Sequence, residues 1–306
     1  MKSKLLITLL LFISVLNSFS QDIIASGLKS FNLYINNPAL TTAENKLQLD
    51  FMGEIKISNS SNPSSSGLFN AIFKLKKINS NIRFSYLRYG FSDIEKWNGA
   101  LLGYSYSKDL SDNLNIAGGF DINYYSVDYS GFYLQSSIDN YSLDPNIPVK
   151  SSDLTDNHLH GILGLAGKYK ELTIGVSSKL ALWNDIGALS YAYKPNAKSG
   201  IQLFQINLIA KYEFKIKEKL TLTPQFEYLH HQNYNAEKDY KIGLFFNYNK
   251  LFGFGIMHDS YIDQLTNISA QVKLFKKVEL IIVYNPTFGG NSTKEMNLYA
   301  QLRVNI

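Results

Sequence analysis

Alternation of apolar and polar residues runs through most of the chain and constrains its fold more than any other feature. In residues 47–57 every second position is apolar or glycine, and polar residues with one methionine fill the positions between. Residues 296–306 repeat the pattern at the end of the chain. Because neighbouring side chains of a β-strand point to opposite faces, this period of two predicts strands with one apolar and one polar face.

The same pattern predicts twelve further strands between these two. They lie near 67–76, 80–90, 98–108, 113–126, 157–169, 171–183, 200–215, 218–231, 239–249, 251–258, 264–275 and 277–285. The total of about fourteen is even, as bacterial outer-membrane barrels require. Many of these segments exceed the usual strand of about 5–6 residues in soluble proteins and reach the about 9–11 that a tilted membrane strand needs. We therefore expect an all-β transmembrane antiparallel barrel. A soluble secreted β-sandwich or propeller is the alternative.

The composition and the connections agree with a barrel. Charged residues make up 18% of the chain, against about 25% in average soluble proteins. There is no cysteine, which excludes disulfide scaffolds, thiolate metal sites and cysteine nucleophiles. Short turns alternate roughly with long connections, the longest of which are 59–66, 129–156 and 184–199. Short turns on one side of the membrane and longer loops on the other are typical of outer-membrane barrels.

The first residues are typical of a secretory signal peptide. Lys2 and Lys4 precede an uncharged apolar run, and small residues follow it at positions 18 and 20. We predict cleavage after Ser20, so that the domains are a signal peptide 1–20, an N-terminal segment 21–45 and a barrel 46–306. Removal of the two lysines lowers the net charge from +5 to about +3, which is too mild to indicate a nucleic-acid partner.

The segment 21–45 contains an Asn-Pro-Ala turn flanked by apolar residues that favour burial. Proline fixes its own φ angle and pushes the preceding residue toward extended backbone, so Asn37 and Pro38 predict a turn. The segment could fold into the barrel lumen, lie along its rim, or be a plain turn that leads into the first strand.

Motifs for catalysis or cofactor binding are weak. His158 and His160 share a strand face, but no third metal ligand has a fixed spacing to them. The consecutive residues 258–260 have the residue types of a catalytic triad, yet neighbours in sequence cannot form that relay. Glycines such as Gly119 and Gly164 lie inside strands, where strand curvature or the approach of a ligand are the two explanations. We predict no catalytic residue, no cofactor and no metal.

Three segments carry a resemblance to a known family. They are "FNLYINNPAL" at 31–40 after the signal peptide, the strand "LQLDFMG" at 47–53 and the ending "EMNLYAQLRVNI" at 295–306. With this strand layout, the mature chain resembles the PorP/SprF membrane proteins of the type IX secretion system of Bacteroidetes. Asn37, Pro38 and Ala39 are the sharpest local match and would be a structural family signature. The middle of the chain departs from the family pattern.

The resemblance implies a non-enzymatic outer-membrane barrel of the secretion and gliding machinery that supports export or surface anchoring of large adhesins. Its partners would be outer-membrane lipid, periplasmic and outer-membrane secretion-system proteins, and adhesin cargo. The long connections 59–66, 129–156 and 184–199 would be docking loops. The alternative function is an outer-membrane channel for small solutes or hydrophobic molecules.

Overall fold

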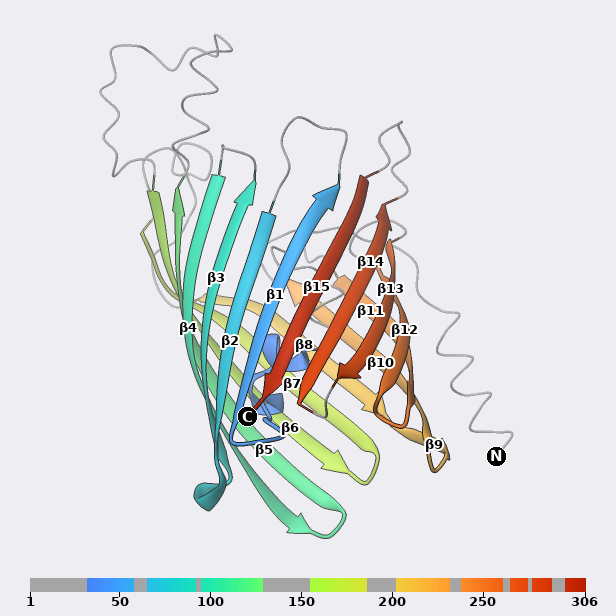
Figure 1. The fold of residues 1–306 in the computed structure, drawn as a ribbon. Helices are drawn as coiled ribbons and strands as arrows, with labels where there is room; N and C mark the ends of the chain where they lie inside the picture. Colours follow the sequence, from blue (N-terminus) through green and yellow to red (C-terminus); the bar gives the residue numbers. More distant parts are fainter. Residues whose placement is uncertain are drawn as a thin grey trace, which may run out of the picture.

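A single antiparallel sheet that closes on itself forms the body of the protein (Figure 1). The computed structural model describes residues 32–57, 65–91, 95–128, 155–185, 202–231, 238–260, 265–274, 277–287 and 295–306. Within these ranges the strands are β1 (Leu47–Ile57), β2 (Ser65–Leu75), β3 (Ser80–Phe91), β4 (Glu95–Ser111), β5 (Leu114–Asp128), β6 (Thr155–Tyr169), β7 (Leu172–Asp185), β8 (Gln202–Tyr212), β9 (Phe214–Lys217), β10 (Leu220–His231), β11 (Lys238–Tyr248), β12 (Phe252–Asp259), β13 (Leu265–Leu274), β14 (Val278–Thr287) and β15 (Glu295–Asn305).

Fourteen strands make up the barrel wall within the described residues, because β8 and β9 are two parts of one strand. Both pair with β10 in the same register, Lys211 opposite Gln225 and Phe214 opposite Leu222. They are separated only at Glu213, whose backbone N–H donates to the carbonyl of Glu171 at the β6–β7 turn. The predicted barrel of about fourteen strands is confirmed, and the strand predicted at 200–215 is interrupted at this one residue.

Closure comes from the pairing of the last strand with the first. β15 lies antiparallel to β1 with Asp50 opposite Arg303, and β10 pairs with β11 on the other side of the wall. The remaining neighbours in the wall are consecutive in sequence, as in an up-and-down barrel. Closure removes the unpaired backbone groups that an open sheet edge would leave in lipid.

The two faces of the wall are inverted relative to a soluble protein. Large apolar side chains point outward, with Leu102 59% and Leu165 65% exposed. The inward face carries polar residues that are almost fully buried, among them Asp50, Arg83 and Gln301. An apolar outer surface with a polar interior is the pattern of a barrel in a membrane. The protein is therefore an outer-membrane β-barrel rather than a soluble β-sandwich or propeller.

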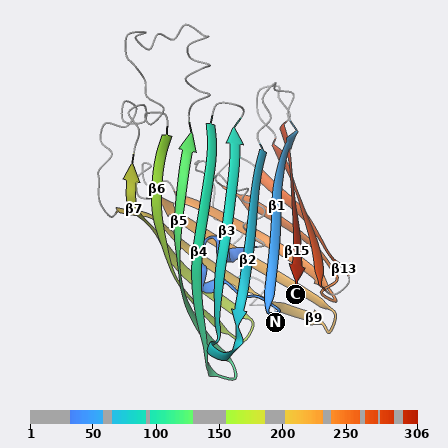
Figure 2. The same ribbon diagram turned by 60° about the vertical axis from the view of Figure 1, so that its left-hand side comes forward.

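The helical elements of the described ranges are three short 3-10 turns, η1 (Leu33–Ile35), η2 (Pro38–Leu40) and η3 (Lys76–Ile78). None of the described helices is long and apolar enough to cross a membrane. Figure 2 shows η1 and η2 in blue inside the barrel, behind the front strands. These two turns lie in the chain just before β1, and they define the site described below.

The two ends of the barrel differ in the length of their connections. At the end where β1 begins and β15 finishes, which we call the turn end, consecutive strands are joined by two to four residues. At the opposite loop end, β5 and β6 are separated by 26 residues and β7 and β8 by 16. The expected docking loops 59–66, 129–156 and 184–199 lie at the loop end and mainly outside the described residues. Their edges at Ser65–Ser66, 155–156 and 184–185 belong to strands.

Candidate functional site: a lumenal plug

Residues 32–46, which we call the plug, lie inside the barrel and contact strands on opposite sides of its wall. Asn37 has extended backbone with φ −137° and ψ 103°, as expected before a proline. Its side-chain oxygen accepts a hydrogen bond from the backbone N–H of Ala39 at 3.0 Å, and Pro38 occupies the first position of η2. This is the N-cap arrangement with proline at N1. Of the three alternatives for segment 21–45, its described part, residues 32–45, shows burial in the lumen.

The amide nitrogen of the Asn37 side chain attaches the plug to the barrel wall. The Nδ2 group donates to the backbone carbonyl of Leu165 on β6 at 3.1 Å and to that of Val176 on β7 at 3.2 Å. The preceding carbonyl, of Asn36, accepts a hydrogen bond from the Ser177 hydroxyl at 2.6 Å. One amide side chain therefore caps η2 and binds two neighbouring strands.

Three glycines make this contact possible. Gly119 on β5 and Gly164 on β6 are opposite each other in the sheet, and Gly175 lies on β7. A Cβ added to Gly119 would lie 2.6 Å from the carbonyl carbon of Pro38, and one added to Gly175 would lie 2.7 Å from Asn37 Nδ2. A Cβ on Gly164 would collide with Asn37 Oδ1. The wall carries no side chain at these three positions, and we call this surface the glycine bed.

The structure explains why Gly119 and Gly164 are glycines, for which the sequence left strand curvature and the approach of a ligand as alternatives. Gly119 and Gly164 allow a close approach, and the approaching group is the protein's own plug rather than a foreign ligand. Gly167, three residues further along β6, has nothing within 4 Å of an added Cβ. Strand glycines of this chain therefore have different roles, which a single sequence does not distinguish.

A charged network binds the N-terminal end of the plug, at Asn32 and Tyr34. Arg303 on β15 donates from Nε to Asp50 on β1 at 2.7 Å and from a terminal nitrogen to the side-chain oxygen of Asn32 at 2.5 Å. Asn32 also donates to Gln301 at 2.7 Å. The Tyr34 hydroxyl donates to Asp50 at 2.6 Å. The plug thereby bridges the pair of strands that closes the barrel.

Tyr34 acts in this network as a neutral donor. Burial and then the neighbouring Asp50 carboxylate raise the pKa of the Tyr34 hydroxyl well above its ordinary value. The guanidinium of Arg83 lies over the Tyr34 ring, 5.1 Å from its centroid, and donates to the Tyr34 carbonyl at 2.7 Å. Arg83 also pairs with Asp121 on β5 at 2.5 Å, with both side chains 1% exposed. Since an unpaired buried charge is costly, the pair fixes Arg83 against the plug.

Further contacts distribute the plug around the lumen. Asn81 and Ser105 donate to the carbonyl of Thr41 at 3.0 and 3.1 Å. Closer to β1, Lys273 pairs with Glu44 at 2.8 Å. These anchors add strands β3, β4 and β13 to those already named. The plug is thus held on many sides and not by one wall alone.

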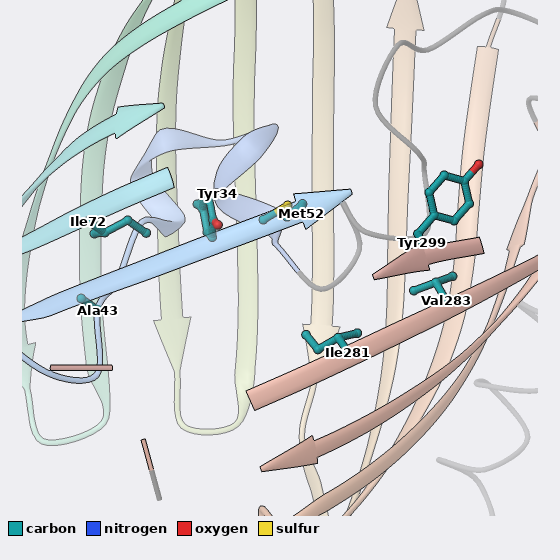
Figure 3. Packing of buried hydrophobic residues seen from close by; sticks show 7 residues of the cluster. All are labelled: Tyr34, Ala43, Met52, Ile72, Ile281, Val283 and Tyr299. Carbon is teal, nitrogen blue, oxygen red and sulfur yellow. The ribbon is translucent and has the colours of Figure 1, made fainter. Parts of the chain in front are cut away.

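A small apolar cluster surrounds the charged network. Figure 3 shows its seven members, drawn from the plug and from β1, β2, β14 and β15, namely Tyr34, Ala43, Met52, Ile72, Ile281, Val283 and Tyr299. They are 0–5% exposed and supply the plug with an apolar contact surface. The lumen therefore contains a packed core on one side of the plug, although its strands present mostly polar residues inward.

The residues around the two histidine motifs differ from those that a metal site or a catalytic triad would need. The ring centroids of His158 and His160 lie 5.9 Å apart, and the residues that the structure describes bring no third histidine or acidic residue to them as a metal-binding group. In the segment 258–260, Asp259 pairs with Lys241 at 3.3 Å and the Ser260 hydroxyl accepts from the backbone N–H of Tyr240. These residues tie β11 to β12.

Sequence reasoning singled out the segment that contains the plug, with burial in the lumen as one of three alternatives, but it missed the residues that bind the plug. Asp50, Arg83, Asp121, Gln301 and Arg303 were not predicted as site residues. Their signal was present, since each is a polar residue on the inward face of an alternating strand. Which inward residues converge on the plug depends on barrel closure, because Asp50 and Arg303 are 253 residues apart in the chain.

Two solved structures with a similar fold are monoaromatic hydrocarbon channels. A TodX monoaromatic hydrocarbon channel with the S2 and S3 segments deleted superposes with a TM-score of 0.55 at 10% identity, covering 89% of this chain and 94% of that chain. The CymD monoaromatic hydrocarbon channel gives 0.52 at 11% identity, covering 92% of each chain. At this identity the likeness concerns the fold alone. No curated protein sequence matches the chain significantly.

The family assignment rests on the sequence as a whole. The family model "Type IX secretion system membrane protein PorP/SprF" matches residues 17–303, which includes the plug and nearly all of the barrel. The match confirms the resemblance drawn from the three sequence segments. The chain belongs to the PorP/SprF family of type IX secretion system membrane proteins.

Proposed function

We propose that this protein is a non-enzymatic scaffold of the type IX secretion and gliding machinery, which supports the export or surface anchoring of large adhesins. Family membership supports a role in type IX secretion. Its partners would be periplasmic and outer-membrane secretion-system proteins and the adhesin cargo. The observation that carries the scaffold role is the plug, which is bound by Asp50 and Arg303 at its N-terminal end and by the glycine bed at its η2 turn.

A fixed plug favours a scaffold over a transport pore. Free passage of solutes requires an aqueous path through the lumen, as in porins, whereas other barrels of the outer membrane are filled by loops or helices. Here the contacts of Asn37 with two strand carbonyls and the buried pair of Arg83 and Asp121 hold the plug in place. In this proposal the wall and its plug form one rigid body that presents docking surfaces at both ends.

The proposal includes an orientation and a processing step. Short turns of outer-membrane barrels face the periplasm, so the turn end would face the periplasm and the long connections the exterior. Residues 1–20 would be removed as a signal peptide; they lie outside the described residues. Asn37, Pro38 and Ala39 would be the family signature that docks the plug, because they contact the glycine bed.

The second candidate function is a channel for small hydrophobic molecules or solutes. The hydrocarbon channels that share its fold support this alternative. It requires the plug to move or to leave a continuous path. Conductance in a planar bilayer distinguishes the two candidates.

Affinity purification tests the scaffold role directly. A tagged chain is extracted from outer membranes in mild detergent, and the proteins retained with it are identified by mass spectrometry. A tagged outer-membrane barrel from outside the family, expressed at the same level, is the control. We expect enrichment of type IX secretion components and a large adhesin over the control. Recovery of the barrel with no such component would contradict the proposal.

A further inference from the structure

Exposed lysines surround the turn end of the barrel. Five of its six strand connections contain a lysine, namely Lys76, Lys170, Lys219, Lys250 and Lys277, and Lys108 lies on β4 near the sixth, the β4–β5 turn. We call these six residues the basic rim. Their side chains are all exposed in the structure. The six connections are distributed around the whole wall, so the positive charge forms a ring rather than one cluster.

Three acidic residues near the rim pair with other lysines, whereas Asp109, Asp112 and Glu218 are exposed and form no ion pair among the described residues. Glu171 pairs with Lys215 at 3.4 Å, and Glu213 pairs with Lys211 at 3.3 Å. Glu44 pairs with Lys273. No ion pair involves a lysine of the basic rim within the residues that the structure describes. The lysines of the rim are therefore not neutralised by ion pairs, and Asp112 and Glu218 offset part of their charge at the β4–β5 and β9–β10 turns.

Turn geometry does not explain these lysines. Lys170 and Lys250 have φ angles of 53° and 55°, in the left-handed region that glycine and asparagine adopt most easily. The β11–β12 turn reads Asn249-Lys250, where hairpins of this kind prefer Asn-Gly. At both turns a lysine occupies a position that another residue would fill with less backbone strain.

Lysines beside the rim on β9 and β6 lie on the face opposite to the apolar residues, whereas Lys108 shares the outward face of β4 with Tyr106, and the Lys170 ammonium lies 5.6 Å from the centroid of the Tyr169 ring. On β9 the side chains of Phe214 and Ile216 alternate with those of Lys215 and Lys217, which places apolar and basic residues on opposite faces. On β6 the same alternation separates Lys168 from Tyr169, which is 54% exposed. Lipid headgroups would meet the outward face, which is aromatic and aliphatic here. A partner in solution would meet the basic face.

We propose that the basic rim is the docking surface for a carboxylate-rich protein segment on the periplasmic side. The proposal rests on the proposed function, since it names the chemistry of a machinery partner at the turn end. Complementary charge steers such a partner to the rim and makes binding sensitive to salt. Lysines on several turns around the plugged mouth suit an extended acidic segment, which can contact several turns at once.

A defined probe tests the charge complementarity. Fluorescein-labelled poly-L-glutamate of about 20 residues, a length that spans several turns when extended, is titrated with the full-length protein in a nonionic detergent, and binding is followed by fluorescence anisotropy. The test variant changes the six basic-rim lysines to glutamine. The matched control changes Arg88→Gln and Lys96→Gln, which are exposed residues toward the loop end. Heat-modifiable mobility in gel electrophoresis verifies that every variant is folded.

We expect salt-sensitive binding by the wild type, at least about tenfold weaker binding by the test variant and unchanged binding by the control. Absence of binding by the wild type, or an equal loss in both variants, would overturn the proposal. Rim-dependent binding to anionic vesicles or to purified peptidoglycan, without binding to poly-L-glutamate, would assign the rim to another ligand and also overturn it. Unchanged recovery of secretion components with the test variant would refute the docking surface while leaving the scaffold role intact.

Discussion

Replacement of Gly119 by alanine tests how closely the plug rests on the wall. The added Cβ would lie 2.6 Å from the Pro38 carbonyl carbon and 2.7 Å from the Ala39 nitrogen, both of them backbone atoms. An ordinary contact begins near 3.4 Å, so this part of the plug must move by about 0.8 Å. That displacement would stretch the 3.1 and 3.2 Å hydrogen bonds of Asn37 beyond bonding distance.

The expected cost of this change follows from overpacking and lost hydrogen bonds. Overpacking of a tight core costs about 1–3 kcal/mol, and each net hydrogen bond contributes about 0.5–1.5 kcal/mol. Relief of the clash by undocking limits the total, so we expect about 1–3 kcal/mol. This corresponds to roughly 5- to 150-fold faster exchange of the protected plug amides if undocking governs exchange.

Hydrogen exchange with mass spectrometry measures this effect in peptides that cover residues 32–46. The amides of Ala39, Leu40 and Thr41 are informative, because each donates a hydrogen bond within the plug. Gly167→Ala on β6 is the matched control, since its added Cβ meets nothing within 4 Å. Exchange in Gly119→Ala that stays within about twofold of both the wild type and this control would refute the close packing, since the expected change is at least about fivefold.

Four further predictions follow from the plug contacts. Asn37→Asp should undock the plug more than Asn37→Ala, because a carboxylate would face the Leu165 and Val176 carbonyls; plug exchange compares the two. Arg83→Met should destabilise the protein by about 3–5 kcal/mol in denaturant unfolding, by leaving Asp121 buried without its partner, and adding Asp121→Asn should recover part of the loss. The hydrogen bond from Lys273, and its charge, lower the pKa of Glu44 although burial opposes them. The exchange protection that this contact gives the plug is therefore present above the ordinary pKa of glutamate, near 4.3, and is lost as the pH falls through the lowered pKa of Glu44. Glu44→Gln should remove this pH dependence, which hydrogen exchange measured as a function of pH would check. Tyr34→Phe should weaken the plug by about 1–3 kcal/mol, because the Asp50 carboxylate loses a donor; stability of the two proteins in denaturant checks this.

The sequence predicted the barrel well because its signal is local. Alternation of Phe51 with Asp50 and Met52 reports one exposed and one buried face wherever the strand sits in the wall. The strand ends were less accurate. The strand expected at 98–108 extends from Glu95 to Ser111, because pairing with β5 continues beyond the point where the apolar alternation weakens.

The site was predicted only in part because its contacts are long-range. Pro38 and its neighbours signalled a turn, which is a local property. The surface beneath that turn combines Gly119, Gly164 and Gly175 from three strands, and glycine spacing along one strand does not reveal which neighbours will align with it. Their alignment follows from sheet register, which the structure supplies.

Single-channel conductance of the purified protein in a planar bilayer tests most directly whether the plug makes this barrel a scaffold. The wild-type chain without residues 1–20 is compared with a variant that also lacks residues 21–45, after electrophoresis has verified that both are folded. The scaffold account predicts that the wild type has no steady conductance and that the plug-deleted barrel conducts. Steady conductance of the wild type equal to that of the deletion variant would contradict the account and favour the channel.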